Sequence, residues 1–219
     1  MNVLVACEES QAVCIEFRRL GHRAFSCDLM EYSGGHPEWH IVGDVLPLLG
    51  GCCEFVTADT HTQAGRWDMI IGFPPCTYLS NAGACRLYPR KGEMDMERYR
   101  KGLDGKEFFL AILNADCDKV AVENPVPSKA FGLPPHSQEI QPWMFGHPYT
   151  KKTRLWLRGL PILMATDIVE PIAPYCPSGT GRKDRTKYGA AKRGDDAKNR
   201  AKTFIGLAKA MAEQWGGYA

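Results

Sequence analysis

Five groups of polar residues follow apolar segments of this chain, and their side chains could do chemistry. Each apolar segment is suited to a buried parallel strand, and each polar group begins where that strand would end. In an open parallel sheet, ligands bind at the carboxyl ends of the strands. The sequence therefore predicts a ligand site built from these groups. They are Cys7-Glu8-Glu9-Ser10, Asp28, Gly43-Asp44, Pro75-Cys76-Thr77 and Glu123-Asn124.

Two of the acidic residues suit an adenosyl cofactor. An acid at the end of the second strand, here Asp28, commonly holds a ribose diol. An acid after the third strand, here Asp44, can accept a hydrogen bond from an adenine amine. Together they favour an adenosyl cofactor, although each could instead be a turn or helix-capping residue.

The elements that must position these residues alternate along the chain. This alternation predicts an α/β fold, a mostly parallel twisted sheet with helices on both faces, in a single domain over residues 1–219. Strand-like segments are expected at 2–6, 22–27, 39–42, 67–73, 119–122 and 154–157, and helices at 11–20, 95–115 and 197–215.

Composition excludes several classes of protein. The apolar runs are much shorter than the roughly 20 residues that span a bilayer, and the chain begins with a strand-like segment, so we expect no membrane partner and a cytoplasmic protein. The 9 cysteines include no CxxC pair. We therefore expect reduced thiols and no metal site.

The near-neutral net charge of +2 conceals an uneven distribution. Residues 1–148 hold 13 Lys and Arg against 19 Asp and Glu, whereas residues 149–202 hold 13 against 5. We expect a basic, mobile insertion around 178–200, which either binds a polyanion such as nucleic acid or is a solvated loop. The candidate nucleic-acid-binding residues are Lys151, Lys152, Arg182, Lys183, Arg185, Lys187, Lys192 and Arg193.

The segment from Gly72 to Gly83, GFPPCTYLSNAG, resembles the catalytic loop of the DNA (cytosine-5) methyltransferases. More closely, the whole chain is similar to small phage and prophage members of that family, which lack a target-recognition domain. The resemblance implies a Rossmann-like methyltransferase fold, S-adenosyl-L-methionine as cofactor and DNA as partner. Other stretches that match in the family's order are Gly43-Asp44-Val45, Glu123-Asn124-Pro125, Gly146-His147-Pro148 and Lys152-Thr153-Arg154.

The resemblance also implies roles for individual residues. Cys76 would add to carbon 6 of cytosine as a thiolate. Glu123, with its proton retained by burial, would bind ring nitrogen 3 and the exocyclic amine. Asn124 would orient the site, Arg154 would contact the base, and Ser80 belongs to the same catalytic loop. The residues that would bind the cofactor are Ala6, Cys7, Glu8, Ser10, Asp28, Leu29, Asp44, Val45 and Pro74.

The chain departs from the family pattern in four ways, and other interpretations compete. Thr77 stands where the family has Gln, and an extra proline precedes Cys76. The loop at residues 6–10 lacks the family's glycines, and only about 40 residues stand where the family inserts its recognition domain. The same Cys76 adduct could instead form on a free cytidine nucleotide, or it could accept a group other than methyl from a different donor. A catalytically silent nucleic-acid-binding protein is a further alternative. Methylation of an amine is disfavoured, because Phe73 cannot accept a hydrogen bond from it.

Purely structural roles also remain possible for the same residues. Cys76 could be a buried structural thiol, and Glu123 could cap a helix. Arg154 alternates with apolar neighbours, so a salt bridge is an alternative to a base contact.

Overall fold

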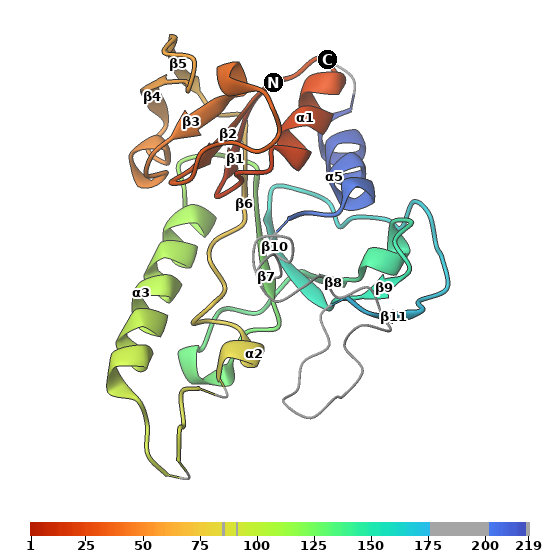
Figure 1. Cartoon of the computed structure of the whole chain (residues 1–219). Helices are drawn as coiled ribbons and strands as arrows, with labels where there is room; N and C mark the ends of the chain where they lie inside the picture. The colour runs from red at the N-terminus through yellow and green to blue at the C-terminus, as the bar shows by residue number, and fades with distance from the viewer. Residues whose placement is uncertain (85, 91, 176–201, 218–219) are drawn as a thin grey trace.

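The computed structural model of this chain describes residues 1–84, 86–90, 92–175 and 202–217. Within these residues, seven strands form one sheet in the order β3-β2-β1-β6-β7-β10-β8 (Figure 1). Neighbouring strands from β3 to β7 are parallel, whereas β10 is antiparallel to both β7 and β8. The predicted α/β fold with a mostly parallel sheet is confirmed. The strands are β1 (Asn2–Ala6), β2 (Arg23–Asp28), β3 (His40–Val42), β6 (Met69–Gly72), β7 (Val120–Pro125), β8 (Gln138–Ile140) and β10 (Thr153–Arg158).

Helices cover both faces of the sheet (Figure 1). Helix α1 (Ala12–Arg19) and helix α5 (Ile205–Met211), which continues as a π-helical turn (Ala212–Gly216), pack together on one face. Helix α3 (Met96–Leu113) covers the other face. Side chains along β1 alternate between these layers: Val3 and Val5 pack on the α1 side, and Leu4 and Ala6 on the α3 side. Burial on both faces explains why this segment is continuously apolar.

Smaller elements lie outside this sheet. Strands β4 (Cys52–Val56) and β5 (Thr62–Arg66) form a hairpin that the sequence did not predict. Most of its side chains are exposed or half-buried, so it has little apolar alternation to detect. Strand β9 (Tyr149–Thr150) pairs with β11 (Ala173–Pro174), and α2 (Asn81–Ala84) is a single helical turn.

The order of the strands reverses between β1 and β6. From β1 the chain proceeds to β2 and β3 on one side, and it then crosses to β6 and β7 on the other. In sheets of this kind the crevice at the carboxyl ends of the strands at the reversal is the usual ligand site. The loops that follow β1 and β6 are therefore the first place to look for function.

Helix α5 begins later than predicted. The expected helix at 197–215 begins at Ile205, because Phe204 is extended, and residues 197–201 lie outside the described part of the chain. The backbone N–H of Gly206 donates to Nε2 of His147 at 3.0 Å. A Cβ atom at Gly206 would collide with the carbonyl oxygen of Phe145. The start of α5 is thus packed directly on the segment that precedes β9.

We predict that Gly206→Ala destabilises the protein by at least about 2 kcal/mol, because a backbone carbonyl cannot give way as a flexible side chain can. Thermal and urea unfolding would measure the change. Gly50→Ala is the matched control, since no atom lies within 4 Å of the added carbon, and it should stay within about 0.5 kcal/mol of wild type. Alanine has a higher intrinsic helix propensity than glycine. A Gly206→Ala protein that is more stable than wild type would therefore contradict the close packing of Gly206 against the Phe145 carbonyl.

Candidate active site

The loop that carries Cys76 leaves β6 at the reversal point of the sheet. Ala6 and Gly72 are paired across β1 and β6, and the N–H of Phe73 donates to the carbonyl of Ala6 at 2.9 Å. Cys76 follows three residues later, after two prolines, and is half-buried. A turn in which the N–H of Ser80 donates to the carbonyl of Cys76 at 2.9 Å closes the loop.

Two backbone hydrogen bonds join this loop to the segment after β7. The N–H of Asn81 donates to the carbonyl of Val126 at 2.8 Å, and the N–H of Ser128 donates to the carbonyl of Leu79 at 2.7 Å. Leu79 itself is fully buried in the α3-facing core. The Cys76 loop is therefore held against the end of the strand that carries Glu123 and Asn124. The Ser80 hydroxyl accepts from the N–H of Gly83 at 3.3 Å and so stabilises the loop itself.

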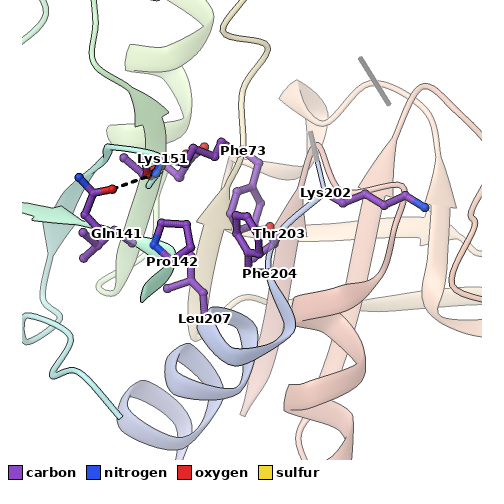
Figure 2. A pocket seen from close by; sticks show the side chains of 11 residues that line it. Phe73, Gln141, Pro142, Lys151, Lys202, Thr203, Phe204 and Leu207 are labelled. Carbon is purple, nitrogen blue, oxygen red and sulfur yellow. Dashed lines mark hydrogen bonds between the residues drawn. The ribbon is translucent and has the colours of Figure 1, made fainter. Parts of the chain in front are cut away.

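Glu123 lines a pocket of about 380 Å³, counting its open mouth, on the α5 side of the sheet. Figure 2 shows this pocket, with Phe73, Lys151 and Phe204 among its labelled side chains. Burial raises the pKa of this carboxyl group, while the charge of Lys151 and the polar hydroxyl of Thr153 partly offset the rise. The pocket therefore favours a protonated Glu123. Its lining consists of Phe73, Glu123, Ile140, Gln141, Pro142, Lys151, Thr153, Lys202, Thr203, Phe204 and Leu207.

Asn124 and Arg154 lie on the opposite face of the sheet from Glu123. They are a cross-strand pair of β7 and β10, and their neighbour Trp156 packs in the α3-facing core. Asn124 is fully buried, and within the described residues neither oxygen nor nitrogen of its side-chain amide has a hydrogen-bond partner. The Nε atom of Arg154 lies 3.5 Å from a carboxylate oxygen of Glu139. The structure thus brings Arg154 to a salt bridge and does not bring it to Glu123.

The ends of β2 and β3 carry the two predicted cofactor acids. Oδ1 of Asp28 accepts from the N–H of Met30 at 2.9 Å, and Oδ1 of Asp44 accepts from Leu46 at 3.0 Å. Both residues thus shape turns and keep a second carboxylate oxygen that could accept from a hydroxyl or an amine. Leu29 beside them is 77% exposed, whereas Val45 is buried.

The loop after β1 has a structural task of its own. Glu8 is buried, and its carboxylate accepts the N–H groups of Val13 at 2.7 Å and Cys14 at 3.2 Å, which caps α1. Burial and the neighbouring Asp28 raise the pKa of the Cys7 thiol. The predicted cofactor contact of Glu8 therefore competes with a capping role. Ala6, Ser10 and Pro74 lie at the same edge of the sheet, as residues that end β1, precede α1 and follow β6.

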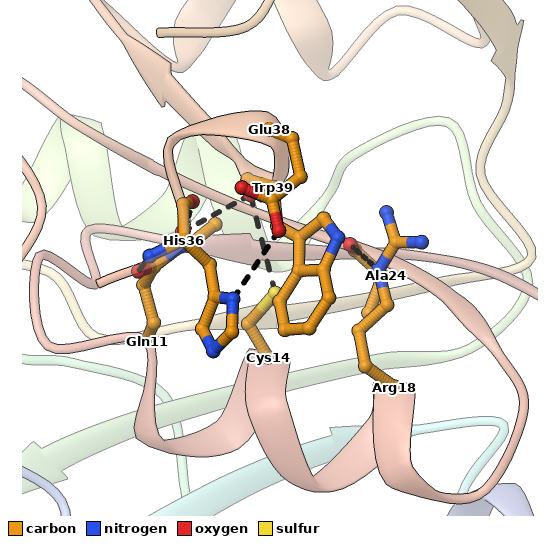
Figure 3. Close-up of polar contacts among 8 residues, drawn as sticks. Gln11, Cys14, Arg18, Ala24, His36, Glu38 and Trp39 are labelled. Carbon is orange, nitrogen blue, oxygen red and sulfur yellow. Dashed lines mark hydrogen bonds and ion pairs between the residues drawn. The ribbon is translucent and has the colours of Figure 1, made fainter. Parts of the chain in front are cut away.

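Gln11 is a positioning residue that sequence reasoning missed. Its side chain donates to the carbonyl of His36 at 2.8 Å and accepts from the N–H of His36 at 3.1 Å (Figure 3). The His36 ring stacks on Trp39 with centroids 3.8 Å apart, and the Arg18 guanidinium lies 5.1 Å from the Trp39 ring. These contacts tie α1 to the connection that follows Asp28. The sequence carries no signal for this role, because neither the burial of Gln11 nor its contact with a residue 25 positions away follows from a residue pattern.

Only part of the predicted nucleic-acid surface is described. Lys151 lines the pocket, and the ammonium of Lys152 lies 2.8 Å from Glu139. The other predicted basic residues lie outside the described part of the chain: Arg182, Lys183, Arg185, Lys187, Lys192 and Arg193. Among the described residues, no helix is long and apolar enough to cross a membrane, and no three His, Cys, Asp or Glu residues are grouped to hold a metal.

No protein-family model matches the chain, and no curated protein matches it. One similar solved structure is an E. coli prophage protein proposed to be a DNA modification methyltransferase. The two chains are 15% identical with a TM-score of 0.43, over 79% of this chain and 53% of the other. This chain therefore spans about half the length of that protein. The case for a function rests on the site itself.

We predict that Glu8 makes stability depend on pH. Burial raises its pKa from 4.5 to about 8. Between these values the folded protein keeps a proton that the unfolded chain loses, so the free energy of unfolding falls as pH rises, by at most about 1.4 kcal/mol per pH unit. Glu8→Gln removes this contribution and one of the two capping bonds. Urea unfolding should show the variant clearly less stable than wild type at pH 5 and the gap narrower at pH 8; a constant gap would contradict the assignment.

Proposed function

We propose that this chain is an S-adenosylmethionine-dependent methyltransferase with a Rossmann-like fold, which acts on carbon 5 of cytosine in DNA through a covalent adduct at Cys76. One observation carries the proposal. The hydrogen bonds between the Cys76 loop and the segment after β7 hold this loop, with its half-buried cysteine, against the end of the strand that carries Glu123, whose carboxyl group has a raised pKa. A nucleophile and a proton donor at neighbouring strand ends suit addition to a pyrimidine ring.

The residues then act in a definite order. The Cys76 thiolate adds to carbon 6, and the π electrons of the carbon 5–carbon 6 bond shift into the ring as Glu123 gives its proton to nitrogen 3. Carbon 5 becomes nucleophilic, and S-adenosylmethionine, when bound, supplies an electrophilic methyl group there. Once the carbon 5 proton leaves to solvent, the sulfur–carbon 6 bond breaks. Cys76 then regains its thiolate, and nitrogen 3 returns its proton to Glu123.

The cofactor would lie along the carboxyl ends of β1, β2 and β3. Asp28 would bind the ribose hydroxyls and Asp44 the adenine amine, with Leu29 and Val45 against the adenine ring. The Cys7–Ser10 loop would lie beside the methionine end. The exposed apolar side chain of Leu29, which follows the turn-forming Asp28 directly in the chain, supports this placement. Opening of a duplex would be needed to present the cytosine.

Cys76→Ser should abolish methyl transfer while leaving cofactor binding intact, because a hydroxyl is far less ionised than a thiol at neutral pH. Transfer of a labelled methyl group to DNA measures the first, and calorimetry with S-adenosylmethionine the second. Cys52→Ser is the matched control, since Cys52 is an exposed cysteine of the β4–β5 hairpin. Robust transfer by the Cys76→Ser protein would refute the mechanism.

A DNA strand with 5-fluorocytosine at its target extends the same test. Fluorine cannot leave as the proton does, so the wild-type protein should remain covalently attached to the strand through Cys76. Peptide mapping by mass spectrometry would locate the bond. In the transfer assay, a labelled methyl group recovered only in free cytidine nucleotide would identify the nucleotide, rather than DNA, as the substrate. DNA binding without any methyl transfer would favour a catalytically silent nucleic-acid-binding protein.

Glu123→Gln should lower kcat by roughly 10²- to 10⁴-fold, because an amide can donate to nitrogen 3 but cannot transfer a proton. In the wild type, kcat should fall as pH rises through the raised pKa of Glu123, since the protonated form is the active one. The variant should lack this alkaline decline. Glu54→Gln, an exposed change on β4, is the control. An unchanged alkaline decline in the Glu123→Gln protein would assign that decline to another group.

A further inference from the structure

The alternation of side chains along β10 decides which cation shares the pocket with Glu123. Leu155 is the cross-strand partner of Glu123 and packs in the α5-facing core, and Thr153 lines the pocket on the same face. Arg154 is the partner of Asn124 and lies on the α3-facing side. The same alternation extends before the strand: Lys151 lines the pocket, and Lys152 pairs with Glu139. The Lys152-Thr153-Arg154 stretch therefore turns its two cations away from the pocket.

Glu139 already balances both of these cations. Its carboxylate lies 2.8 Å from the ammonium of Lys152 and 3.5 Å from Nε of Arg154. The two cations hold the pKa of Glu139 below its usual range, with Lys152 the larger cause. These groups are partly exposed, so the pairs add little to stability. They do hold the Lys152 and Arg154 charges together beside Glu139 of edge strand β8, away from Glu123.

Lys151 is held in the pocket by its own backbone. Its N–H donates to the side-chain oxygen of Gln141 at 2.9 Å (Figure 2), and its carbonyl accepts from the Thr153 hydroxyl at 3.2 Å. Its ammonium lies 5.9 Å from the centre of the Phe204 ring, within cation–π range. Lys202 also lines the pocket, but Figure 2 shows its side chain extending away from Phe73 and Phe204. Lys151 is therefore the cation best placed beside Glu123.

We infer that Lys151, rather than Arg154, binds the carbonyl oxygen at carbon 2 of the cytosine that Glu123 holds. This inference rests on the proposed function. When sulfur adds to carbon 6, negative charge spreads over nitrogen 3 and this oxygen. The Glu123 proton neutralises the charge on nitrogen 3. An ammonium group beside the carbonyl oxygen stabilises the charge that forms there. Phe73 and Phe204 supply apolar walls suited to a planar ring.

The test compares Lys151→Met with Lys151→Arg, Arg154→Met and the surface control Lys209→Met in the full-length protein. The rate of covalent attachment to a 5-fluorocytosine strand at saturating DNA should fall about 100-fold or more in Lys151→Met, as for loss of one group that stabilises developing charge. It should be partly restored in Lys151→Arg and unchanged in Lys209→Met. Loss with Arg154→Met, combined with a rate near wild type in Lys151→Met, overturns the inference. Circular dichroism and thermal unfolding would exclude misfolded variants.

A second measurement does not depend on the reaction. Because the charge of Lys151 lowers the pKa of Glu123, Lys151→Met should raise that pKa further in a carbon-13 NMR titration of the carboxyl group. If Arg154→Met changes the pKa of Glu123 and Lys151→Met does not, the placement of Lys151 beside Glu123 is overturned, even if no methyl group is transferred. The two measurements separate the failure of the proposed function from the failure of the placement. If the wild type forms no adduct, the proposed function fails, and the contact of Lys151 with the base fails with it. If Lys151→Met still raises the pKa of Glu123, the placement of Lys151 beside Glu123 stands.

Discussion

The register between β7 and β10 is the constraint on which the site depends. Because side chains alternate across a strand, a slip by one residue would exchange the two faces of β10. That slip would bring Arg154 into the α5-facing core and expel Leu155, which is fully buried there, while Trp156 would lose its place on the α3 side. Burial of two large apolar side chains on opposite faces thus holds the register. The same register sets which polar side chain meets Glu123.

Much of the framework could be predicted from the sequence, because parallel strands buried on both faces are nearly continuous in apolar residues. The placement of Cys76 and Glu123 at the same edge of the sheet follows from that prediction, whereas the pairing of β6 with β7 does not. The face of the sheet on which Arg154 lies cannot be predicted in this way, because it depends on the antiparallel insertion of β10 between β7 and β8. Strand β8 has three residues, too few for a periodic signal. A Lys-x-Arg pattern names charges but cannot say which face of a sheet they occupy.

The glycine-free loop after β1 shows a second limit of sequence reasoning. Cys7 has φ of 60° and Gln11 has φ of 58°, in the left-handed region that favours glycine. Such conformations cost roughly 1 kcal/mol or more for other residues. Here the cost is offset locally, since Glu8 caps α1 between them and the Gln11 side chain holds both polar backbone groups of His36. The loop thus adopts backbone conformations typical of glycine, while its Glu8 and Gln11 side chains form hydrogen bonds that stabilise the adjacent segments. No residue pattern reveals this combination.

The pocket forms only when distant segments come together. Phe73 follows β6, Glu123 ends β7, Lys151 precedes β10, and Phe204 leads into α5. The docking of α5 therefore completes the pocket as well as the core. The Tyr175 ring, which follows β11, lies 4.7 Å from the ring of Phe204, so this segment also packs against the residues that lead into α5.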